Sequence, residues 1–290
     1  MSDADNTMAD SNELSHLGVS TLFEDAWLLA IDKPAGIIVH DDGTGAPTLT
    51  DLARGHLEAA GEGDVAAQLQ AVQRLDRDTT GVVLFSKDKD VQPKLDAALA
   101  GRVAAAVGAV TRGMPGATTA SPADAAPAPD ARLAPDARPA RKRYLVVVRG
   151  EFPWKIRTLD GPIGRDRHDA RRMRVSSGGK PAETRVRRLA TSGARGSRRS
   201  LLLVELVTGR KHQIRVHLAH AGFPILGDAL YGTPADRGHR APALMLHAFE
   251  GRLTHPVTGE PLVIRAPYPE RFAQAFPDGL ALAEAALARG

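Results

Sequence analysis

Cysteine is absent from the chain, aromatic residues make up only 4% of it, and no long hydrophobic run occurs. Without cysteine the protein cannot form disulfides, use a thiol as a catalyst or bind zinc or iron–sulfur clusters through thiolates. No apolar stretch approaches the ~18–20 residues that a membrane-spanning helix needs. Residues 1–15 are polar and acidic and lack the apolar core of a secretory signal. Together these absences predict a cytoplasmic protein that does not contact a membrane.

The composition is that of a globular protein whose charge is unevenly distributed. The 290 residues are 43% hydrophobic and 25% charged, which is enough to form a core without disulfide or metal crosslinks. The formal net charge is +4, yet residues 138–215 carry 22 Lys and Arg against 6 Asp and Glu. The rest of the chain carries 16 against 28. Such an asymmetric field favours a polyanionic partner, above all a nucleic acid, although a generally arginine-rich surface would give the same counts.

Two segments have the composition of disordered chain. Residues 1–18 form an acidic tail with almost nothing to bury, and order is expected from Val19 onward. Between Val103 and Ala140, 20 of 38 residues are Ala or Pro without periodicity, which predicts a flexible insertion. We expect this insertion to interrupt one domain over residues 19–275, followed by a C-terminal helix over 276–290. A boundary between two domains is the alternative, because so long a loop is unusual inside a domain.

Short apolar runs and amphipathic stretches alternate irregularly along the chain. Strands are predicted at residues 27–31, 81–85, 144–148, 183–189, 201–207, 245–253 and 261–265. Helices are predicted at residues 50–60, 88–100, 210–221 and 270–287. Thr208 is the expected N-cap of the third helix, and Gly222 with Pro224 is expected to end it. Because strands outnumber helices without strict βαβ alternation, the pattern favours an α+β fold with a mixed, largely antiparallel sheet flanked by helices.

The segment Gln73–Gly81 places Asp76 in a polar loop just before an apolar strand. Catalytic groups are commonly carried by loops on a rigid scaffold. Taken alone, Asp76 could equally be a turn residue or the partner of Arg74. The sequence has no glycine-rich phosphate loop of the Walker or dinucleotide-binding type, which argues against nucleotide hydrolysis and dinucleotide redox chemistry. The function therefore depends on what accompanies Asp76.

The residues around Asp76 carry a resemblance. Arg74-Leu75-Asp76 followed by Thr79-Thr80-Gly81 resembles the catalytic motif of the RluA-type pseudouridine synthases, HRLDxxTSG. Further blocks resemble motifs of the same family in the same order, namely Asp32–Gly36, Lys142–Tyr144, Pro162–Arg165 with Gly179–Thr184, Thr208–His217 with Gly222–Asp228 and Tyr231-Gly232, and finally Leu246–Ala248, His255-Pro256 and Ala266-Pro267. The match covers roughly residues 20–270.

The sequence departs from the family pattern in two places. Gln73 stands where the family usually has histidine, which could alter a hydrogen bond near the site. The Ala/Pro-rich insertion lies where the family normally has a short link. With fewer than twenty residues ahead of the domain, no S4-type RNA-binding domain is expected before it.

The resemblance implies an isomerase that converts uridines of 23S ribosomal RNA or tRNA to pseudouridine without a cofactor. It gives Asp76 the role of nucleophile, Arg215 that of its ion-pair partner and Tyr144 that of the ring packed on the target base. A carboxylate can attack ribose C1′ or uracil C6 and later leave, and a guanidinium keeps it ionised in a partly desolvated pocket. The tyrosine can stack, and its hydroxyl can assist removal of the C5 proton. A helix beginning at Thr208 would place Arg215 two turns in.

Basic residues around these motifs are candidates for RNA binding. Five of the ten residues from Arg165 to Arg174 are arginines, which suits phosphate contacts better than core packing. Arg74 could fill the space left by a flipped nucleotide or bind its phosphate. The candidate substrate-binding residues are Arg74, Arg165, Arg167, Arg171, Arg172, Lys211 and His212.

Two other functions compete with this interpretation. His212, His217 and His220 in one helix would suit a metal-dependent hydrolase, but their spacings do not match HExxH and no acidic residue lies between them, so no metal site is expected. A non-catalytic RNA-binding protein of the same fold is the other alternative, although it would have no need of Asp76, Tyr144 and Arg215 together. We expect a monomer, because no heptad pattern or self-pairing strand is evident.

Overall fold

The computed structural model describes residues 19–99, 140–239 and 241–289. A ten-stranded sheet runs in the order β1-β2-β4-β11-β5-β10-β9-β6, with β12 paired to β11 and β3 paired to β4. All of its pairs are antiparallel except β11 with β4. This confirms the predicted α+β class and the mixed, largely antiparallel sheet. The predicted tail over 1–18, and the predicted insertion over 103–140 apart from Ala140, lie outside the described residues.

Every predicted strand overlaps an observed one. The strands of the main sheet are β1 Ser20–Glu24, β2 Leu28–Lys33, β3 Gln70–Ala71, β4 Thr80–Ser86, β5 Arg141–Arg149, β6 Ile156–Leu159, β9 Thr184–Ser192, β10 Arg199–Leu206, β11 Leu246–Thr254 and β12 Pro261–Arg265. A separate hairpin consists of β7 Ile163–Arg165 and β8 Met173–Val175. The helices are α2 Leu49–Ala59, α3 Gly63–Gln68, α4 Gln92–Leu99, α5 Gln213–His220, α6 Glu270–Ala275 and α7 Gly279–Ala288, with a 3₁₀ turn η1 at Pro234–Asp236.

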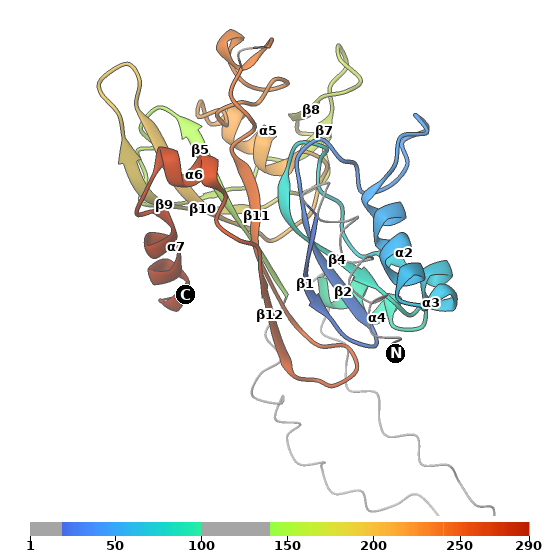
Figure 1. Ribbon diagram of the computed structural model, residues 1–290. Helices are drawn as coiled ribbons and strands as arrows, with labels where there is room; N and C mark the ends of the chain where they lie inside the picture. The colour runs from blue at the N-terminus through green and yellow to red at the C-terminus, as the bar shows by residue number, and fades with distance from the viewer. Residues whose placement is uncertain (1–18, 100–139, 240, 290) are drawn as a thin grey trace, which may run out of the picture.

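Helices cover both faces of the strands in the first half of the sheet. Side chains alternate between the faces of a strand, so Leu29 of β2 packs in one cluster with Leu57 of α2, while Leu28 packs in another with Leu95 of α4. Figure 1 shows α2, α3 and α4 beside β1, β2 and β4, and α6 and α7 beside β9 and β10. None of the helices in the described ranges is long and apolar enough to cross a bilayer.

The predicted single helix over 270–287 is wrong. The chain forms α6, leaves the helical conformation at the buried Phe276 and resumes as α7 at Gly279, within the predicted C-terminal segment 276–290. A Cβ at Gly279 would lie 2.0 Å from Oη of Tyr268, so only glycine lets α7 begin this close to that ring. An Ala- and Leu-rich composition predicts helix but does not show where tertiary contacts interrupt it.

The one parallel pair brings the loop before β4 to the middle of the sheet. Thr80 and Gly81 of β4 pair with His247 and Ala248 of β11. Gly81 has a φ of +107°, and a Cβ there would lie 2.2 Å from the Ala248 carbonyl oxygen. Only glycine allows this approach. The loop carrying Asp76 is thereby fixed beside β11 and β5, at the end of the molecule toward which Figure 1 shows the β7–β8 hairpin extending.

Candidate active site

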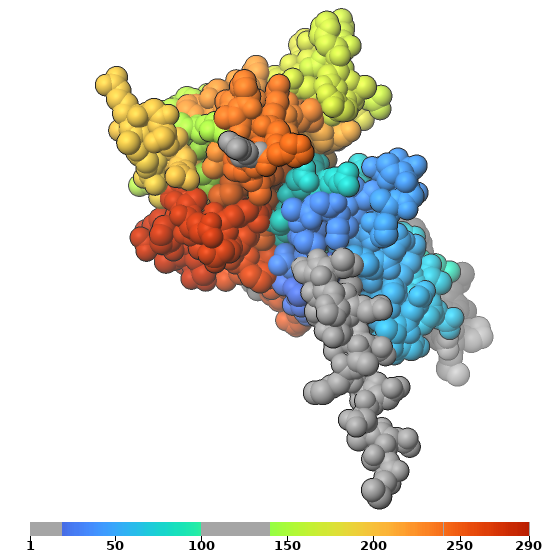
Figure 2. Space-filling model, turned by 45° about the horizontal axis from the view of Figure 1, so that its top comes forward, coloured from blue at the N-terminus to red at the C-terminus, as the bar shows by residue number. Residues whose placement is uncertain are grey.

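A pocket of about 70 Å³ lies between the loop before β4, β5 and the start of α5. The structure brings five of the sequence-predicted residues to its wall, namely Arg74, Asp76, Tyr144, His212 and Arg215. In Figure 2 the segment before β4 (teal) comes to the surface between the blue N-terminal segments and the orange segments that follow α5. The remaining predicted residues, Arg165, Arg167, Arg171, Arg172 and Lys211, do not line this pocket.

Lys33 of β2 fixes the loop that carries Asp76. Its buried Nζ donates hydrogen bonds to the carbonyl oxygens of Pro34 (2.8 Å), Arg77 (2.7 Å) and Thr79 (2.9 Å). Burial lowers the pKa of Lys33 to about 8, against the opposing charges of Asp78 and Asp76, so the ammonium remains the main form at pH 7. Three N–H donors thus meet three carbonyls, and two of these carbonyls flank Asp76 in the loop.

Replacing Lys33 by methionine is expected to lower both stability and turnover. Three buried carbonyls would lose their donor, which should reduce the free energy of unfolding by about 2 kcal/mol and loosen the loop enough to lower turnover roughly 10-fold. Lys87→Met is a matched control, because Lys87 is also a buried ammonium but pairs with Glu24 and Glu62, away from the pocket. Equal turnover losses per folded molecule in the two variants would show that Lys33 does not position the loop.

Arg215 joins two carboxylates. Its Nη1 donates to Asp76 Oδ2 at 2.8 Å, while Nε and Nη2 donate to Asp228 Oδ2 and Oδ1, each at 2.8 Å. The Asp228 side chain is fully buried and also accepts the backbone N–H groups of Leu230 and Tyr231. Burial alone would raise the pKa of Asp228, but the hydrogen bonds and charge of Arg215 outweigh it and hold that pKa below its ordinary value. The charged Asp228 therefore orients the guanidinium toward Asp76.

The helix that carries Arg215 starts later than predicted. α5 begins at Gln213, and its N-cap is His212, without a side-chain cap. Thr208 is not the cap, because its hydroxyl accepts the Glu183 N–H and donates to Gln213 Oε1. Gln213 Oε1 also accepts the Arg210 N–H, and Gln213 Nε2 donates to the Glu183 carbonyl. These bonds hold residues 208–213 in a turn, so Arg215 lies in the first turn of α5 and not two turns in.

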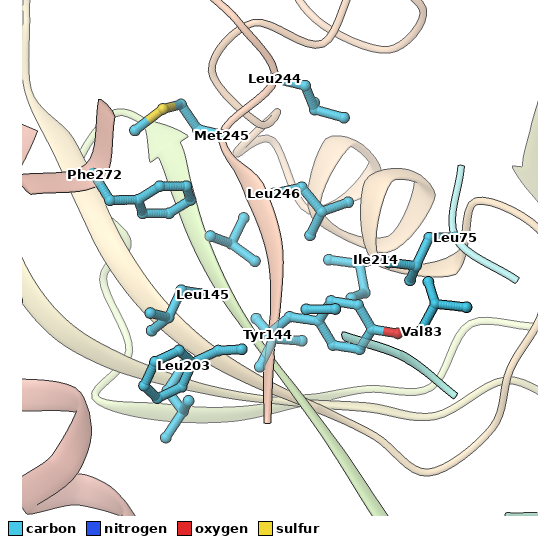
Figure 3. Packing of buried hydrophobic residues seen from close by; sticks show 14 of the residues in the cluster. Leu75, Val83, Tyr144, Leu145, Leu203, Ile214, Leu244, Met245, Leu246 and Phe272 are labelled. Atoms are coloured by element: carbon cyan, nitrogen blue, oxygen red, sulfur yellow. The ribbon is translucent and has the colours of Figure 1, made fainter. Parts of the chain in front are cut away.

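Tyr144 of β5 is buried at the pocket, only 7% exposed. Figure 3 shows its ring next to Ile214, with Leu75 and Leu246 nearby, and all three also line the pocket. Burial, and secondarily the negative charge of Asp76, raises the pKa of Tyr144 well above its ordinary value. Its hydroxyl is therefore protonated and a poor base, whereas the ring is well placed for stacking.

Tyr231 is a site residue that the sequence reasoning missed. The guanidinium carbons of Arg172 and Arg215 each lie 5.2 Å from the centre of its ring. Its hydroxyl accepts the Met173 N–H at 2.7 Å and lies 2.8 Å from His212 Nδ1. Asp228 and Tyr231 both stand in motifs that resembled the family, but nothing local indicated which partners they would have.

The remaining arginine candidates lie on or beside the β7–β8 hairpin. Arg165 and Arg167 are exposed, and Arg171 is exposed with its guanidinium paired to Asp169. Arg172 is half-buried over Tyr231, so it connects the hairpin to the pocket. Lys211 is exposed in the turn before α5. Figure 2 shows the yellow-green hairpin projecting from the surface near the teal segment before β4.

The three histidines considered as a metal site have separate surroundings. His217 is buried and contacts Thr184 Oγ1 and the Gly161 carbonyl, His212 contacts Tyr231, and His220 is exposed. Within residues 19–99, 140–239 and 241–289, no three His, Cys, Asp or Glu side chains form a group that could hold a metal ion.

Comparison with known proteins agrees with this site. Residues 27–105 and 131–220 match the RNA pseudouridylate synthase family. The chain is 34% identical over 249 residues to the uncharacterized RNA pseudouridine synthase YhcT of Bacillus subtilis, covering 86% of this chain and 68% of that protein. It is 33% identical over 270 residues to ribosomal large subunit pseudouridine synthase D of Nitrosomonas europaea, covering 91% and 66%. The chain thus spans about two thirds of the length of these relatives.

The fold is also found among solved structures. Human RNA pseudouridylate synthase domain containing 4 superposes with a TM-score of 0.64 at 22% identity, covering 92% of this chain and 94% of that one. Because the family match covers more than half of the sequence and relatives above 30% identity span most of it, the chain belongs to the RluA-type RNA pseudouridine synthases, a family of intramolecular isomerases.

Proposed function

We propose that Asp76 is the nucleophile with which this enzyme converts specific uridines of ribosomal RNA or tRNA to pseudouridine. The observation that carries the proposal is the bridge from Asp228 through Arg215 to Asp76, at a pocket walled by Tyr144. One Asp76 oxygen is bound by Arg215, and the side chain keeps 27% of its surface exposed, so the carboxylate is both oriented and accessible. Such a group can attack a reacting carbon and later leave.

The reaction needs no atom from outside the substrate and its solvent. Asp76 forms a bond to ribose C1′ or to uracil C6, the N1–C1′ bond breaks, and the base turns so that C5 bonds to C1′. The bond to Asp76 then breaks, C5 loses its proton and N1 gains one. The target uridine has to leave its stack to reach the pocket, and we propose that Tyr144 then packs on the base while Arg74 contacts its phosphate or fills the vacated space.

The choice of RNA rests on analogy and charge. The Nitrosomonas europaea relative carries a ribosomal large subunit name, which favours 23S ribosomal RNA, whereas the name of the Bacillus subtilis relative specifies no target. The exposed arginines of the β7–β8 hairpin suit the phosphates of either RNA. We further propose that the enzyme works as a cytoplasmic monomer, because residues of a single chain form the whole pocket.

Transcriptome-wide pseudouridine mapping, with and without the gene, tests the proposal. A deletion strain would be complemented with the wild-type gene or with the Asp76→Asn variant. We expect at least one pseudouridine to disappear on deletion and to return only with the wild type. If no site changes in any RNA, the enzymatic proposal fails for this chain and a non-catalytic RNA-binding role takes its place.

Replacing Arg165 and Arg167 by alanine is expected to weaken RNA binding and flatten its salt dependence. Each lost phosphate contact should reduce the slope of log affinity against log salt by about 0.7–1. Binding is measured by salt titration with the mapped RNA. Arg289→Ala is the control, because Arg289 is exposed at the end of α7, away from the hairpin in Figure 1. An unchanged salt slope in the double variant would exclude the hairpin arginines as phosphate contacts.

A further inference from the structure

His212 has an unusual backbone conformation at the pocket wall. Its φ is 57° and its ψ 20°, and among the described residues other than glycine it alone has a positive φ. Histidine enters this left-handed region more readily than most residues, but the conformation persists only where surrounding contacts impose it. Here the bonds of Gln213 to Thr208, Arg210 and Glu183 impose it. The turn thereby commits the imidazole to the pocket, where only 11% of the side chain is exposed.

Tyr231 determines which nitrogen of His212 carries the proton. The Tyr231 hydroxyl already accepts the Met173 N–H, and its own proton needs an acceptor. The hydrogen bonds of the described residues offer it one acceptor, His212 Nδ1 at 2.8 Å. If Nδ1 carried the proton instead, two donors would face each other and the hydroxyl proton would be left unpaired. Nδ1 is therefore the acceptor, and in the neutral ring the proton lies on Nε2.

The Nε2–H group of His212 faces the nucleophile and has no acceptor of its own among the described residues. It lies 3.8 Å from Asp76 Oδ1, beyond hydrogen-bonding distance, while Arg215 binds the other oxygen, Oδ2. Burial lowers the pKa of His212, and the positive charges of Arg215 and Lys211 lower it further, against the raising effect of Asp76 and Asp228. The ring is therefore neutral near pH 7, with a spare donor directed into the pocket.

We propose that His212 donates its Nε2–H to an acceptor oxygen of the target uridine, and that Tyr231 is the positioning residue that holds His212 in this tautomer. This inference rests on the proposed function, because it needs a uridine beside Asp76. The carbons that Asp76 could attack, C1′ and C6, are next to the ribose 2′-hydroxyl and to uracil O2 on the N1 side of the base. Either oxygen can accept the bond. A neutral donor binds such an oxygen without forming the salt bridge with Asp76 that a protonated imidazole would form.

The tautomer can be measured without any RNA. Nitrogen-15 NMR of the full chain at neutral pH is expected to show His212 with Nε2 protonated and Nδ1 bare. Tyr231→Phe keeps the ring between the two arginines but removes the hydroxyl, so a mixture of tautomers is expected, whereas Tyr268→Phe should leave His212 unchanged. A wild-type His212 that is charged or protonated on Nδ1 would overturn the proposal even if the protein is an active pseudouridine synthase.

Two substitutions separate the pocket donor from the contact with Tyr231. The amide nitrogen of glutamine can reach the place of Nε2, whereas that of asparagine reaches only the place of Nδ1. We expect His212→Asn to lower kcat/KM about 10-fold on a synthetic stem-loop with the mapped uridine, and His212→Gln to restore most of it. His220→Asn, on the exposed side of α5, is the matched control. Unfolding curves of each variant show whether the chain is folded.

Modified RNAs identify the acceptor. If the ribose hydroxyl is bound, the penalty of His212→Asn should vanish on a stem-loop with 2′-deoxyuridine at the target; if uracil O2 is bound, it should vanish with 2-thiouridine. A penalty that persists on both RNAs, or an equal loss in the glutamine and asparagine variants, would overturn the proposal. Failure of the proposed function is distinct, because the wild type would then convert none of these RNAs.

Discussion

Replacing Asp76 by asparagine is expected to lower pseudouridine formation by at least about 10³-fold while RNA affinity changes only a few-fold. The amide has the size of the carboxylate but cannot form the covalent bond to the substrate. Arg215 keeps its two bonds to Asp228, so the pocket should retain its shape. Affinity should persist because phosphate contacts dominate it, and Asp76 makes none. Single-turnover conversion and equilibrium binding, measured on the same RNA, give the two quantities separately.

Asp78→Asn is the matched control for this experiment. Asp78 lies two residues further along the same loop, is exposed, and removes the same charge from the same region. We expect it to retain activity within a few-fold. If Asp76→Asn loses binding and turnover equally, or if both variants lose turnover alike, the electrostatics of the loop and not a nucleophile would explain the result.

The three central residues could be predicted because each stands in a continuous stretch of matching sequence. Asp76, Tyr144 and Arg215 come from a loop, a strand and a helix far apart in the chain, yet all three line one pocket. Their neighbours in the motifs specify them independently of the fold. Strand positions were also predictable, because β2, β4, β5 and β10 are apolar runs whose buried side chains leave a clear pattern.

Residues whose roles depend on distant partners could not be predicted. Lys33 acts through carbonyls 44 and 46 residues away in the chain, and Tyr231 acts through Met173, 58 residues away. Their side chains have no unusual sequence context, and their partners are backbone groups that every residue possesses. The order of the strands is equally non-local, since β11 lies between β4 and β5.

The start of α5 shows how a local rule can fail. Threonine before an apolar helix usually caps it, and on that basis Thr208 was the expected N-cap. In the structure Gln213 provides the partners of Thr208 and Arg210, and the helix starts five residues later. The six-residue turn that results is what gives His212 its left-handed conformation. The error in the helix boundary therefore falls on the segment that shapes the pocket, as expected where function overrides local preference.

Replacing Arg215 by methionine is expected to abolish turnover and to destabilise the protein. Asp76 loses its orienting cation, and the buried carboxylate of Asp228 loses its only ion-pair partner in the described structure. Leaving such a charge unpaired should lower the free energy of unfolding by about 3 kcal/mol near pH 7. Turnover per folded molecule should fall at least about 10²-fold. Arg215→Lys should be nearly as inactive, because an ammonium cannot reproduce the planar fork that binds both carboxylates.

The double variant Arg215→Met with Asp228→Asn separates the two effects. Removing the buried charge should recover most of the lost stability without recovering turnover, since Asp76 still lacks its partner. The pH dependence gives an independent check. In the wild type the lowered pKa of Asp228 contributes stability above its ordinary pKa that is lost as the pH falls through the folded value. In Arg215→Met that pKa should rise, so the stability deficit should grow between about pH 4 and pH 7 and be absent from the double variant. If the double variant regains turnover along with stability, Arg215 serves only to neutralise Asp228 and takes no part in holding the nucleophile.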